Sequence, residues 1–567
     1  MTDTILSILR AGAAAHPEAT ALRFVDPAEL DFEGSAPSIV TYGQLLERVV
    51  ALANAYRTLS GKERPVVSLL IPSTIDGVIA LLAAEVAGRA NPINHFLAPD
   101  EIAAAMAAAG ADIAVAHGAG GAQGVWSRLE AAAPDVRARI ATDRASAPTG
   151  AHALRDLLRT HPTELQGAEP QADDLAALFN TAGTTGRPKI VPLTHRNLLA
   201  AASGLSSAWA LGPGTRIVNA LPLFHVAGSN LLLTAPLLAG AEVQMFSEAG
   251  LRSPLVLARH WEIVEHARPT IIGGIPSSLV ALLDIPLKGA DISSVRFCAT
   301  GGAPMPAIAA AQFEGMFGLP IHTIYGMTEA AGLIATAPLG VSPDYATVGR
   351  PAPQTELRIL EYGENGAGAP VNGGAGVIAL RGPQVFGGYL DGGGLADGWL
   401  VTGDMGVLGV DGTLAVTGRA KDIIIRSGNN IDPSVIEEAA GSHPAIATCA
   451  AVAMPDRYAG EVPALFVTLH EGRASDPEAI GEHLRQRLAE PHARPAHIIV
   501  VPELPLTRVG KVFRVELRRM AAQHALRTAL PEFDGALSLG ADGAVTVTGI
   551  DCPDARRTIQ ELGLRIA

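Results

Sequence analysis

Hydrophobic residues along this chain fall into short apolar runs that alternate with segments of helical spacing. Runs typical of buried strands occupy Val66–Ile71, Ile113–Ala116, Ile271–Ile275 and Val295–Thr300. Apolar residues at helical spacing occupy Ile75–Ala87, Asp100–Ala109, Arg196–Trp209, Ser277–Leu283 and Pro306–Phe317. Strands that alternate with helices are typical of α/β layers around a largely parallel sheet. The pattern therefore predicts an α/β fold over most of the chain.

The pattern changes in the C-terminal part. Glycine and asparagine dominate from Tyr362 to Gly374, which predicts turns. Beyond Lys421, a compact α+β unit is expected from the strands and the helix predicted at Ala447–Val452, Ala464–Leu469, Ile498–Val501 and Pro477–Leu488. Past the last motif, Val545–Thr548 is expected as a strand and Ala555–Leu562 as a helix, and no function follows from their sequence.

Length and charge limit the classes of protein. A chain of 567 residues is too long for one simple core, so two or more domains are expected. The net charge of -14, without any basic block, argues against binding to nucleic acid or to an anionic membrane surface. An anionic substrate must therefore be held by a local site.

The location of the protein is predicted from its cysteines and its apolar runs. Cys298, Cys449 and Cys552 are scattered without metal spacing, which favours a reducing cytoplasm. The run from Ile217 to Ala241 lacks charges and is long enough to span a bilayer, but prolines and His225 interrupt it. We interpret it as buried strand, loop and helix. The N-terminus lacks the basic start of a signal peptide, so a cytoplasmic protein without a membrane span is expected.

The stretch from Thr181 to Lys189 carries the strongest chemical signal. Its glycines let a backbone approach a ligand closely, its threonines add hydroxyl donors, and Lys189 adds a positive charge. Such a loop can surround a polyphosphate with N–H groups and hydroxyls. It differs from a P-loop because Pro188 precedes the lysine and Ile190 follows it. A flexible surface turn is the alternative interpretation.

This loop resembles the phosphate loop of the adenylate-forming superfamily, which contains AMP-forming acyl-CoA synthetases, adenylation domains of peptide synthetases and firefly luciferase. The usual form there is Thr-Ser-Gly-Thr-Thr-Gly-x-Pro-Lys-Gly, and this chain departs from it at Ala182 and Ile190. The first departure removes a donor whose bond to a charged group is worth roughly 1.5–3 kcal/mol, so a lower affinity for ATP is expected. The resemblance implies that ATP is bound by Thr181, Gly183, Thr184, Thr185, Gly186 and Lys189.

Two further motifs follow predicted strands. Thr300–Pro304 reads as a strand-to-helix turn, and such turns at the carboxyl ends of parallel strands are where ligands bind. In Tyr325–Glu329 a tyrosine can stack on a purine, a hydroxyl can bind phosphate, and a carboxylate can hold Mg²⁺. A buried tyrosine with a surface glutamate is the alternative. The resemblance implies contacts with ATP from Gly302, Ala303, Pro304, Tyr325, Gly326, Met327 and Thr328, and metal binding by Glu329 and Thr184.

Leu221–Gly228 contains an aromatic–histidine pair in an apolar segment, where a histidine is more often a satisfied core residue. In the superfamily this pair lies at the wall of the acyl pocket. The resemblance therefore implies that His225 positions the carboxylate, and that the pocket includes Val226, Gly228, Gly301, Ala330 and Ala331. Small residues surround the expected pocket, namely Ala227, Gly228, Ala299, Gly301, Ala330, Ala331 and Gly332, which leaves volume for a medium-to-long aliphatic chain or for a ring.

The remaining motifs lie near the predicted change of domain. Asp404 can accept hydrogen bonds from both ribose hydroxyls. The alternative is that Thr402-Gly403-Asp404 is an ordinary turn that contains an aspartate. A solvated charge cluster is the alternative for Gly418–Ile431. The resemblance implies that Asp404 and Arg419 bind ATP, that Lys421 is an interdomain hinge, and that Ser427 and Gly428 flank the CoA channel. Lys511, in Pro505–Arg514, resembles the mobile catalytic lysine, which neutralises charge as the carboxylate attacks the α-phosphate.

Together the motifs predict an AMP-forming acid–thiol ligase with ATP, Mg²⁺ and CoA as cofactor and co-substrates. The catalytic residues would be Lys511, Thr328, Glu329 and His225, and the substrate a fatty (medium-to-long) or aryl acid. A large multi-sheet domain is expected over residues 1–420, and a small mobile α+β domain over 422–567 with an extension after about residue 527. A monomer or homodimer is expected.

Two alternatives stay open. Adenylation for a carrier protein, or release of acyl-AMP, would use the same motifs, although no carrier domain is visible in the sequence. A nucleotide-binding pseudoenzyme is disfavoured because Glu329, Asp404, Arg419 and Lys511 occur together. A serine hydrolase is disfavoured because the sequence contains no Gly-x-Ser-x-Gly elbow.

Overall fold

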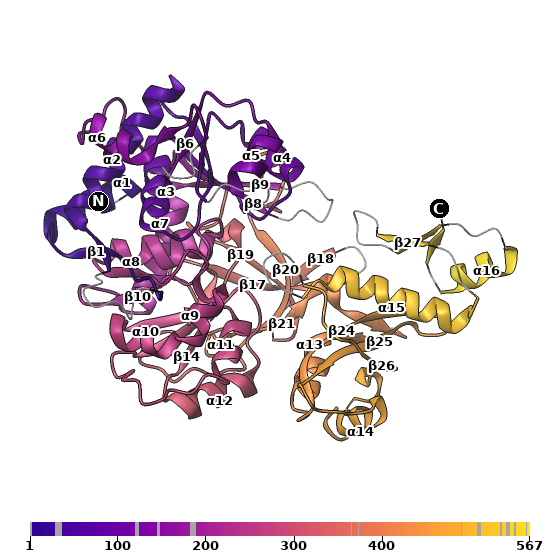
Figure 1. Ribbon diagram of the computed structural model, residues 1–567. Coiled ribbons are helices and arrows are strands. Elements are labelled where there is room, and N and C mark those ends of the chain that lie inside the picture. Colours follow the sequence, from indigo (N-terminus) through magenta and orange to yellow (C-terminus); the bar gives the residue numbers. More distant parts are fainter. Residues whose placement is uncertain are drawn as a thin grey trace.

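The protein forms a large N-terminal domain and a smaller C-terminal domain, as Figure 1 shows for the computed structural model. The predicted α/β class is confirmed. The structure describes residues 3–28, 37–118, 124–143, 148–181, 189–363, 366–371, 373–427, 429–488, 490–506, 512–532, 536–539, 545–548, 552–562 and 564–566.

A seven-stranded sheet, with the order β7-β6-β5-β3-β4-β8-β9, is parallel except for the final pair β8–β9. Its strands are β3 (Val66–Leu70), β4 (Arg89–Pro92), β5 (Ile113–Ala116), β6 (Ala138–Ala141), β7 (His152–Ala153), β8 (Leu175–Thr181) and β9 (Lys189–Thr194). The associated helices are α2 (Tyr42–Ser60), α3 (Ile75–Ala87), α4 (Pro99–Ala109), α5 (Val125–Ala132), α6 (Leu154–Thr160) and α7 (His195–Ala208). The predicted alternation of strands and helices is confirmed here.

A nine-stranded sheet has the order β16-β15-β14-β13-β12-β10-β11-β1-β2. Its strands are β1 (Thr20–Phe24), β2 (Ser38–Thr41), β10 (Arg216–Val218), β11 (Glu242–Met245), β12 (Ile271–Gly274), β13 (Phe297–Gly301), β14 (Ile321–Tyr325), β15 (Ala335–Thr336) and β16 (Arg350–Pro351). Its helices are α1 (Ile5–Ala15), the π-helix η2 (Ala227–Thr234), α8 (Ala235–Leu238), the 3₁₀ turn η3 (Gly250–Arg252), α9 (Pro254–Ala258), α10 (His260–Ala267), α11 (Pro276–Leu282), α12 (Ala307–Phe317) and the 3₁₀ turn η4 (Thr328–Ala330).

Polar caps set the start of the helices around these sheets. Thr41 and Thr194 each begin a helix with a reciprocal capping box, in which the threonine hydroxyl accepts from the N–H of the residue three positions on. Inside the domain, apolar faces from both sheets join one continuous core that includes Phe179, Leu223 and Leu333. The run Ile217–Ala241 forms strand, loop and helix within it, as predicted.

A five-stranded antiparallel sheet lies between the two large sheets and the small domain (Figure 1). Its strands are β17 (Glu356–Gly363), β18 (Gly366–Pro370), β19 (Gly376–Arg381), β20 (Leu400–Leu408) and β21 (Leu414–Arg419). The prediction of turns throughout Tyr362–Gly374 is wrong, because Gly366–Pro370 is a strand paired with β17. Pairing with a neighbouring strand outweighs the weak strand preference of glycine.

After the five-stranded sheet the chain forms the 3₁₀ turn η5 (Ala420–Asp422) and continues into the smaller C-terminal domain. Its sheet contains β22 (Ile424–Arg426), β23 (Asn429–Ile431), β24 (Ile446–Asp456), β25 (Gly460–Leu469) and β26 (His497–Val500), and its helical elements are α13 (Pro433–Gly441), α14 (Pro477–Arg487), η6 (Pro491–Ala493) and α15 (Arg514–Ala529). The chain ends in β27 (Ala536–Leu539), β28 (Val545–Thr548), α16 (Pro553–Glu561) and β29 (Arg565–Ile566). The α+β prediction and the predicted final strand and helix are confirmed.

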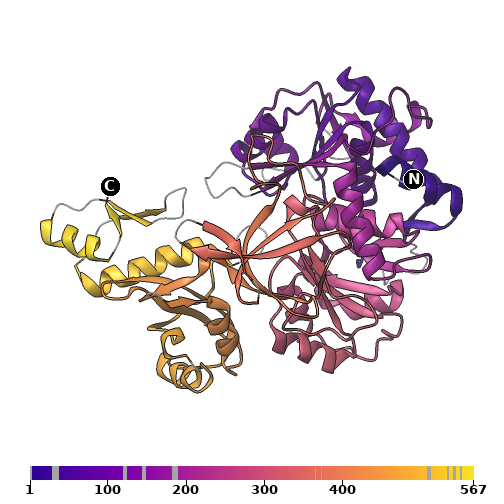
Figure 2. The same ribbon diagram turned by 180° about the vertical axis from the view of Figure 1, so that it is seen from behind.

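The C-terminal elements pack on the end of α15, at the side that faces away from the large domain (Figure 2). Leu526 of α15 is buried against Val547, Ile559 and Leu562 in a separate small core. Across the part of the chain that the structure describes, none of the helices is both long enough and apolar enough to cross a bilayer.

Glu85, near the end of α3, is a carboxyl group buried inside the seven-stranded layer. The side chain is 2% exposed, its Oε2 atom has no hydrogen-bond partner among the described residues, and α3 packs against α2, β3, β4 and β8. Burial raises the pKa of Glu85 from 4.5 to about 8, so the folded protein holds this carboxyl group in its neutral form near neutral pH.

We expect the substitution Glu85→Gln to stabilise the protein at alkaline pH but not at acidic pH. Because the folded pKa lies above the unfolded one, the stability linked to Glu85 is complete below the unfolded pKa and is lost as pH rises toward about 8. Glutamine removes this loss, which amounts to up to about 3 kcal/mol near pH 7. Melting midpoints measured between about pH 5 and pH 8 check this. The control is Glu47→Gln, an exposed carboxylate on α2; an equal shift at both ends of the range would contradict the explanation.

Candidate active site

The carboxyl ends of two neighbouring parallel strands bring the predicted glycine-rich and tyrosine motifs together. β13 and β14 pair so that Gly301 lies opposite Ile324. A Cβ atom on Gly301 would lie 2.7 Å from the Ile324 carbonyl oxygen, so a side chain has no room there. Gly302 follows with a φ of 80°, which favours glycine. Residues 302–304 and 325–329 therefore leave the same edge of the nine-stranded sheet.

A tight turn carries Thr328 and Glu329. Gly326 lies against Gly332 so closely that a Cβ atom on Gly326 would be 1.9 Å from the Gly332 carbonyl oxygen. The Gly332 N–H donates to the Met327 carbonyl at 3.0 Å, which closes the turn. Glu329 inside it is 7% exposed. The backbone therefore fixes the Thr328–Glu329 pair independently of any ligand.

Tyr325, Asp404 and Arg419 form a chain of polar contacts between two sheets. The Tyr325 hydroxyl donates to Oδ2 of Asp404 at 2.8 Å, and Nε of Arg419 lies 3.2 Å from Oδ1 of Asp404. Asp404 and Arg419 are opposite each other in the β20–β21 pair. Burial and the Asp404 carboxylate raise the pKa of Tyr325 above its ordinary value, so the phenol remains a donor. Three separate sequence motifs thus meet at one place.

His225 lies where the loop after β10 enters the π-helix η2. The Ala227 N–H donates to Nδ1 of His225 at 3.2 Å, so this ring nitrogen is an acceptor and the ring is oriented by the backbone. Gly228 packs on the preceding loop, and a Cβ atom there would lie 2.3 Å from the Pro222 carbonyl oxygen. π-helical turns are rare and often occur at functional sites.

The π-helix contacts the turn that carries Glu329. Asn230 donates from Nδ2 to the carbonyl oxygens of Leu198 and Ala331, each at 3.0 Å. A Cβ atom on Gly332 would lie 3.5 Å from Cγ1 of Val226. Ala330 and Ala331 are fully buried at this contact. Val226, Gly228, Ala330 and Ala331, predicted for the acyl pocket, are therefore grouped around η2.

The predicted phosphate loop connects β8 to β9. Thr181 pairs with Lys189, and its hydroxyl donates to the Lys189 carbonyl at 3.3 Å, which closes the base of the loop. Gly183, Thr184, Thr185 and Gly186 lie outside the described residues. Ile190, the second departure from the usual motif, is 4% exposed in an apolar cluster with Val66 and Leu178. Ile190 therefore fills a core position of β9.

Tyr389 is a site residue that the sequence analysis missed. Its hydroxyl donates to Oε1 of Glu329 at 2.7 Å, and Nζ of Lys189 lies 4.8 Å from the centroid of its ring. Burial and the bond to Glu329 raise the pKa of Tyr389 above its ordinary value. These partners lie far away in sequence, so no local pattern marks the residue. The only sequence signal is a tyrosine after the glycine pair 387–388 in a glycine-rich loop.

Lys421 and Ser427, predicted as the hinge and as a residue of the CoA channel, are in contact with elements of the small domain. Arg518 of α15 donates to the Lys421 carbonyl and, at 2.8 Å, to Oδ1 of Asp422. Ser427 has a φ of 50° in the β22–β23 turn, and its N–H donates to the Ala459 carbonyl. Gly428 and Lys511 lie outside the described residues. The base of the segment containing Lys511 is closed by the pairing of Leu506 with Val512.

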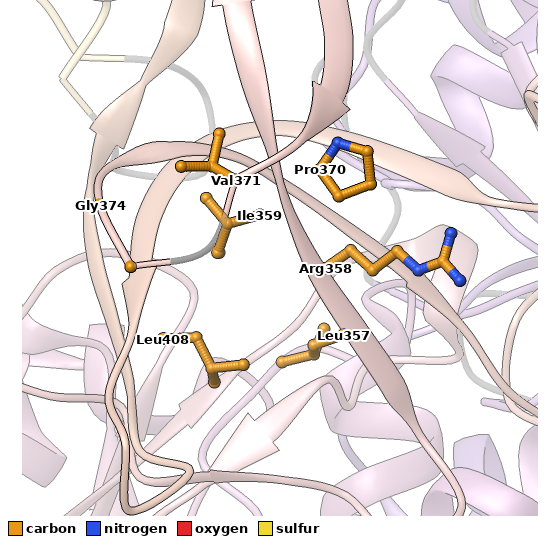
Figure 3. Close-up of a pocket in the computed structure, with 8 residues that line it drawn as sticks. Leu357, Arg358, Ile359, Pro370, Val371, Gly374 and Leu408 are labelled. Atoms are coloured by element: carbon orange, nitrogen blue, oxygen red, sulfur yellow. The ribbon is translucent and has the colours of Figure 1, made fainter.

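A separate hollow lies in the five-stranded sheet. Figure 3 shows Leu357, Ile359, Val371 and Leu408 around it, with Arg358 extending away. The guanidinium of Arg358 lies 4.1 Å from the ring centroid of Trp399. None of the predicted site residues that the structure describes lines this hollow, so we place the candidate site at the sheet edges described above.

Comparison with known proteins identifies the family. Residues 9–390 match the family described as AMP-binding enzyme, and residues 435–511 match the AMP-binding enzyme C-terminal domain. The chain therefore belongs to the AMP-binding enzyme family, and the predicted adenylate-forming superfamily is confirmed.

Individual relatives refine the class. A sulfoacetate–CoA ligase of Cupriavidus necator is 31% identical over 526 residues, covering 91% of this chain and 97% of the relative. A long-chain-fatty-acid–CoA ligase of Bacillus subtilis is 33% identical over 378 residues, which cover 65% of this chain and 66% of the relative. The crystal structure of the anthranilate CoA ligase AuaEII with anthranoyl-AMP has a TM-score of 0.80 and 23% identity, covering 92% of this chain and 98% of the other, and it shows the common fold. The predicted class, ATP-dependent acid–CoA ligase, is confirmed, with ATP and CoA as its co-substrates.

We expect Gly326→Ala to abolish most adenylation without unfolding the protein. The new methyl group would meet the Gly332 backbone, which cannot move unless the Thr328–Glu329 turn opens. Misplacing a reacting geometry by about 1 Å costs on the order of 100-fold in rate. ATP–pyrophosphate exchange and melting curves measure both effects. Gly315→Ala is the control, since a Cβ atom on that exposed glycine of α12 meets nothing within 4 Å. Wild-type exchange by Gly326→Ala would contradict the role of the turn.

Proposed function

We propose that the protein joins a fatty (medium-to-long) or aryl carboxylic acid to CoA, with ATP converted to AMP and pyrophosphate through an acyl-AMP intermediate. The observation that carries this proposal is the contact of Tyr325 with Asp404 and of Asp404 with Arg419. An aromatic ring, a carboxylate and a guanidinium at one edge suit the adenine, the ribose hydroxyls and the phosphates of one nucleotide. Gly302, Ala303, Pro304, Gly326 and Met327 supply backbone beside it.

The phosphates and Mg²⁺ are assigned to the turn and the loop. Thr328 binds the α-phosphate, while Thr181, Gly183, Thr185, Gly186 and Lys189 surround the others. Glu329, with Thr184, would hold Mg²⁺. No cluster of three or more His, Cys, Asp or Glu suited to a metal occurs in the described ranges, which fits Mg²⁺ because proteins commonly bind it through one or two carboxylates plus substrate phosphates. When bound, it supplies charge neutralisation at the phosphates.

The acid is assigned to the space beside η2. The backbone N–H of Ala227 orients the His225 ring through Nδ1, which supports its proposed role in positioning the carboxylate. Beside Val226, the residues Gly228, Gly301, Ala330 and Ala331 are small, which supports a substrate with an extended chain or a ring. The relatives named above act on sulfoacetate and on long-chain fatty acids, so overall likeness does not identify the acid.

The two steps of the reaction are assigned to two domain arrangements. We place the boundary at Lys421, with residues 1–420 in the large domain and 422–567 in the small one. Lys511 would reach the carboxylate and the α-phosphate during adenylation and neutralise the charge that develops between them. The small domain would then turn about Lys421, so that Ser427 and Gly428 flank the path of the CoA thiol. A cytoplasmic location and a monomeric or homodimeric state belong to the same proposal.

The main alternative is transfer of the acyl group to a carrier protein, or release of acyl-AMP. Both would use the nucleotide site unchanged and would differ only in the acceptor. A direct comparison of CoA with a phosphopantetheinylated carrier protein separates them. Loss of nucleotide chemistry altogether is disfavoured because Tyr325, Asp404 and Arg419 contact one another and Glu329 is also present.

We expect AMP and pyrophosphate as stoichiometric products when a panel of acids, from acetate to palmitate and including benzoates, is supplied with Mg·ATP and CoA. Activity should peak among medium-to-long or aryl acids because small residues surround the pocket. Chromatography of the nucleotides and of the acyl-CoA measures both. ADP and phosphate as the products would overturn the proposed reaction, and a peak at acetate would overturn the proposed acid class.

We expect the two lysines to affect different half-reactions. Lys511→Ala should lower pyrophosphate exchange by about 10²–10³-fold, because it removes a charge that is used at the moment of attack. It should affect the conversion of supplied acyl-AMP to acyl-CoA much less. Lys421→Pro, which fixes φ at about -65°, should impair the second half-reaction, formation of the thioester, more than the first, adenylation. Equal losses in both half-reactions for both variants would contradict domain alternation.

A further inference from the structure

Tyr389 contacts two oppositely charged groups that the proposed function directs at the same nucleotide. On one side its hydroxyl is bonded to Oε1 of Glu329 at 2.7 Å. On the other side the ammonium of Lys189 lies 4.8 Å from the ring centroid. A phenol that donates to a carboxylate has a more electron-rich ring, which strengthens its attraction for a cation. The two contacts therefore support each other.

The segment that carries Tyr389 is tied to both of its partners by the backbone. The Phe386 N–H donates to the Glu329 carbonyl at 2.9 Å, and the Leu390 N–H donates to the Ile190 carbonyl at 3.1 Å. Asn197 of α7 donates from Nδ2 to the carbonyl oxygens of Pro383 and Val385, each at 2.9 Å. The start of the segment is thus fixed to α7, and the residues around the tyrosine are fixed to the turn and to β9.

Packing restricts the tyrosine ring itself. The Phe386 ring meets the Tyr389 ring edge to face, with centroids 5.0 Å apart. Gly394 passes beneath with a φ of 103°, and a Cβ atom there would lie 3.0 Å from Cδ2 of Tyr389. The Tyr389 N–H donates to the Gly393 carbonyl, and the Gly392 N–H donates to the Tyr389 carbonyl. The side chain therefore has little freedom to leave Glu329.

We infer that Tyr389 is a positioning residue that holds the Glu329 carboxylate in place for Mg·ATP and keeps Lys189 apart from it. Opposite charges on neighbouring flexible side chains attract each other, and a direct Glu329–Lys189 ion pair would withdraw both from the nucleotide. The face of the ring holds the ammonium, and the hydroxyl orients the carboxylate. This inference rests on the proposed function, because it needs Glu329 and Lys189 to face the bound nucleotide.

The test measures how strongly Mg²⁺ increases the affinity for ATP. Binding of a fluorescent ATP analogue to the full-length protein is titrated with excess Mg²⁺ and with EDTA, and pyrophosphate exchange is followed against Mg²⁺ concentration. Tyr389→Phe keeps the ring but removes the hydroxyl, so we expect the Mg²⁺-dependent gain in affinity to fall about tenfold, in the range of a lost hydrogen bond to a charged group. Tyr389→Leu also removes the ring and should further weaken binding in EDTA, since Lys189 is then released.

A double-mutant cycle separates positioning from simple structural support. In a Glu329→Gln background, Tyr389→Phe should have almost no further effect on the Mg²⁺-dependent gain, because its partner carboxylate is already absent. Tyr345→Phe is the matched control: Tyr345 also donates to a carboxylate, Oε2 of Glu314 at 2.6 Å, at the other end of β14. It should leave the Mg²⁺-dependent gain at the wild-type value.

The outcomes distinguish this inference from the proposed function. A wild-type protein that binds Mg·ATP, together with a Tyr389→Phe variant that shows the same Mg²⁺-dependent gain, would overturn the role of Tyr389 and leave the proposed function intact. Equal losses for Tyr389→Phe and Tyr345→Phe would show a general structural effect and would also overturn it. A wild-type protein that binds no ATP would overturn both.

Discussion

The hydrogen bond from Tyr325 to Asp404 joins the nine-stranded sheet to the five-stranded sheet at the candidate site. Tyr325 ends β14 of the nine-stranded sheet, and Asp404 belongs to β20 of the five-stranded sheet. Since Asp404 lies opposite Arg419 in β20–β21, this bond also sets the position of the strand that leads into η5. The proposed nucleotide site and the strand that leads toward the small domain therefore depend on the same contact.

Glycine makes this arrangement possible at two points where backbones meet. Gly326 lies against Gly332, and Gly301 lies against Ile324, each too close for a Cβ atom. These contacts bring the end of β13 and the turn after β14 to the same edge. The conformational entropy lost when this turn is ordered is offset by the protein's own packing, because Ala330 and Ala331 are fully buried in the main core. The site is thus preorganised, which is what electrostatic catalysis requires.

The sequence correctly predicts helices and strands whose signals lie in neighbouring residues of the chain. The helix Ile75–Ala87 and the strand Ile113–Ala116 were predicted with their observed bounds, because apolar periodicity and nearby turn residues mark them. β18 was missed because its stability comes from pairing with β17, and its glycines carry no strand signal. Tyr389 was missed for a similar reason, since its partners Glu329 and Lys189 are brought to it only by the tertiary fold.

The junction with the small domain shows where a rotation would have to occur. Arg518 binds both the Lys421 carbonyl and the Asp422 carboxylate, and Arg514 on the same helix lies 2.8 Å from Oε1 of Glu437 in α13. The peptide between Lys421 and Asp422 is therefore fixed to α15 and belongs to the small-domain body. If the domain turns as proposed, the change in dihedral angles must fall at Lys421 or before it. The Arg419–Asp404 contact lies on the other side of that point and can remain intact, so the nucleotide need not be released when the small domain moves.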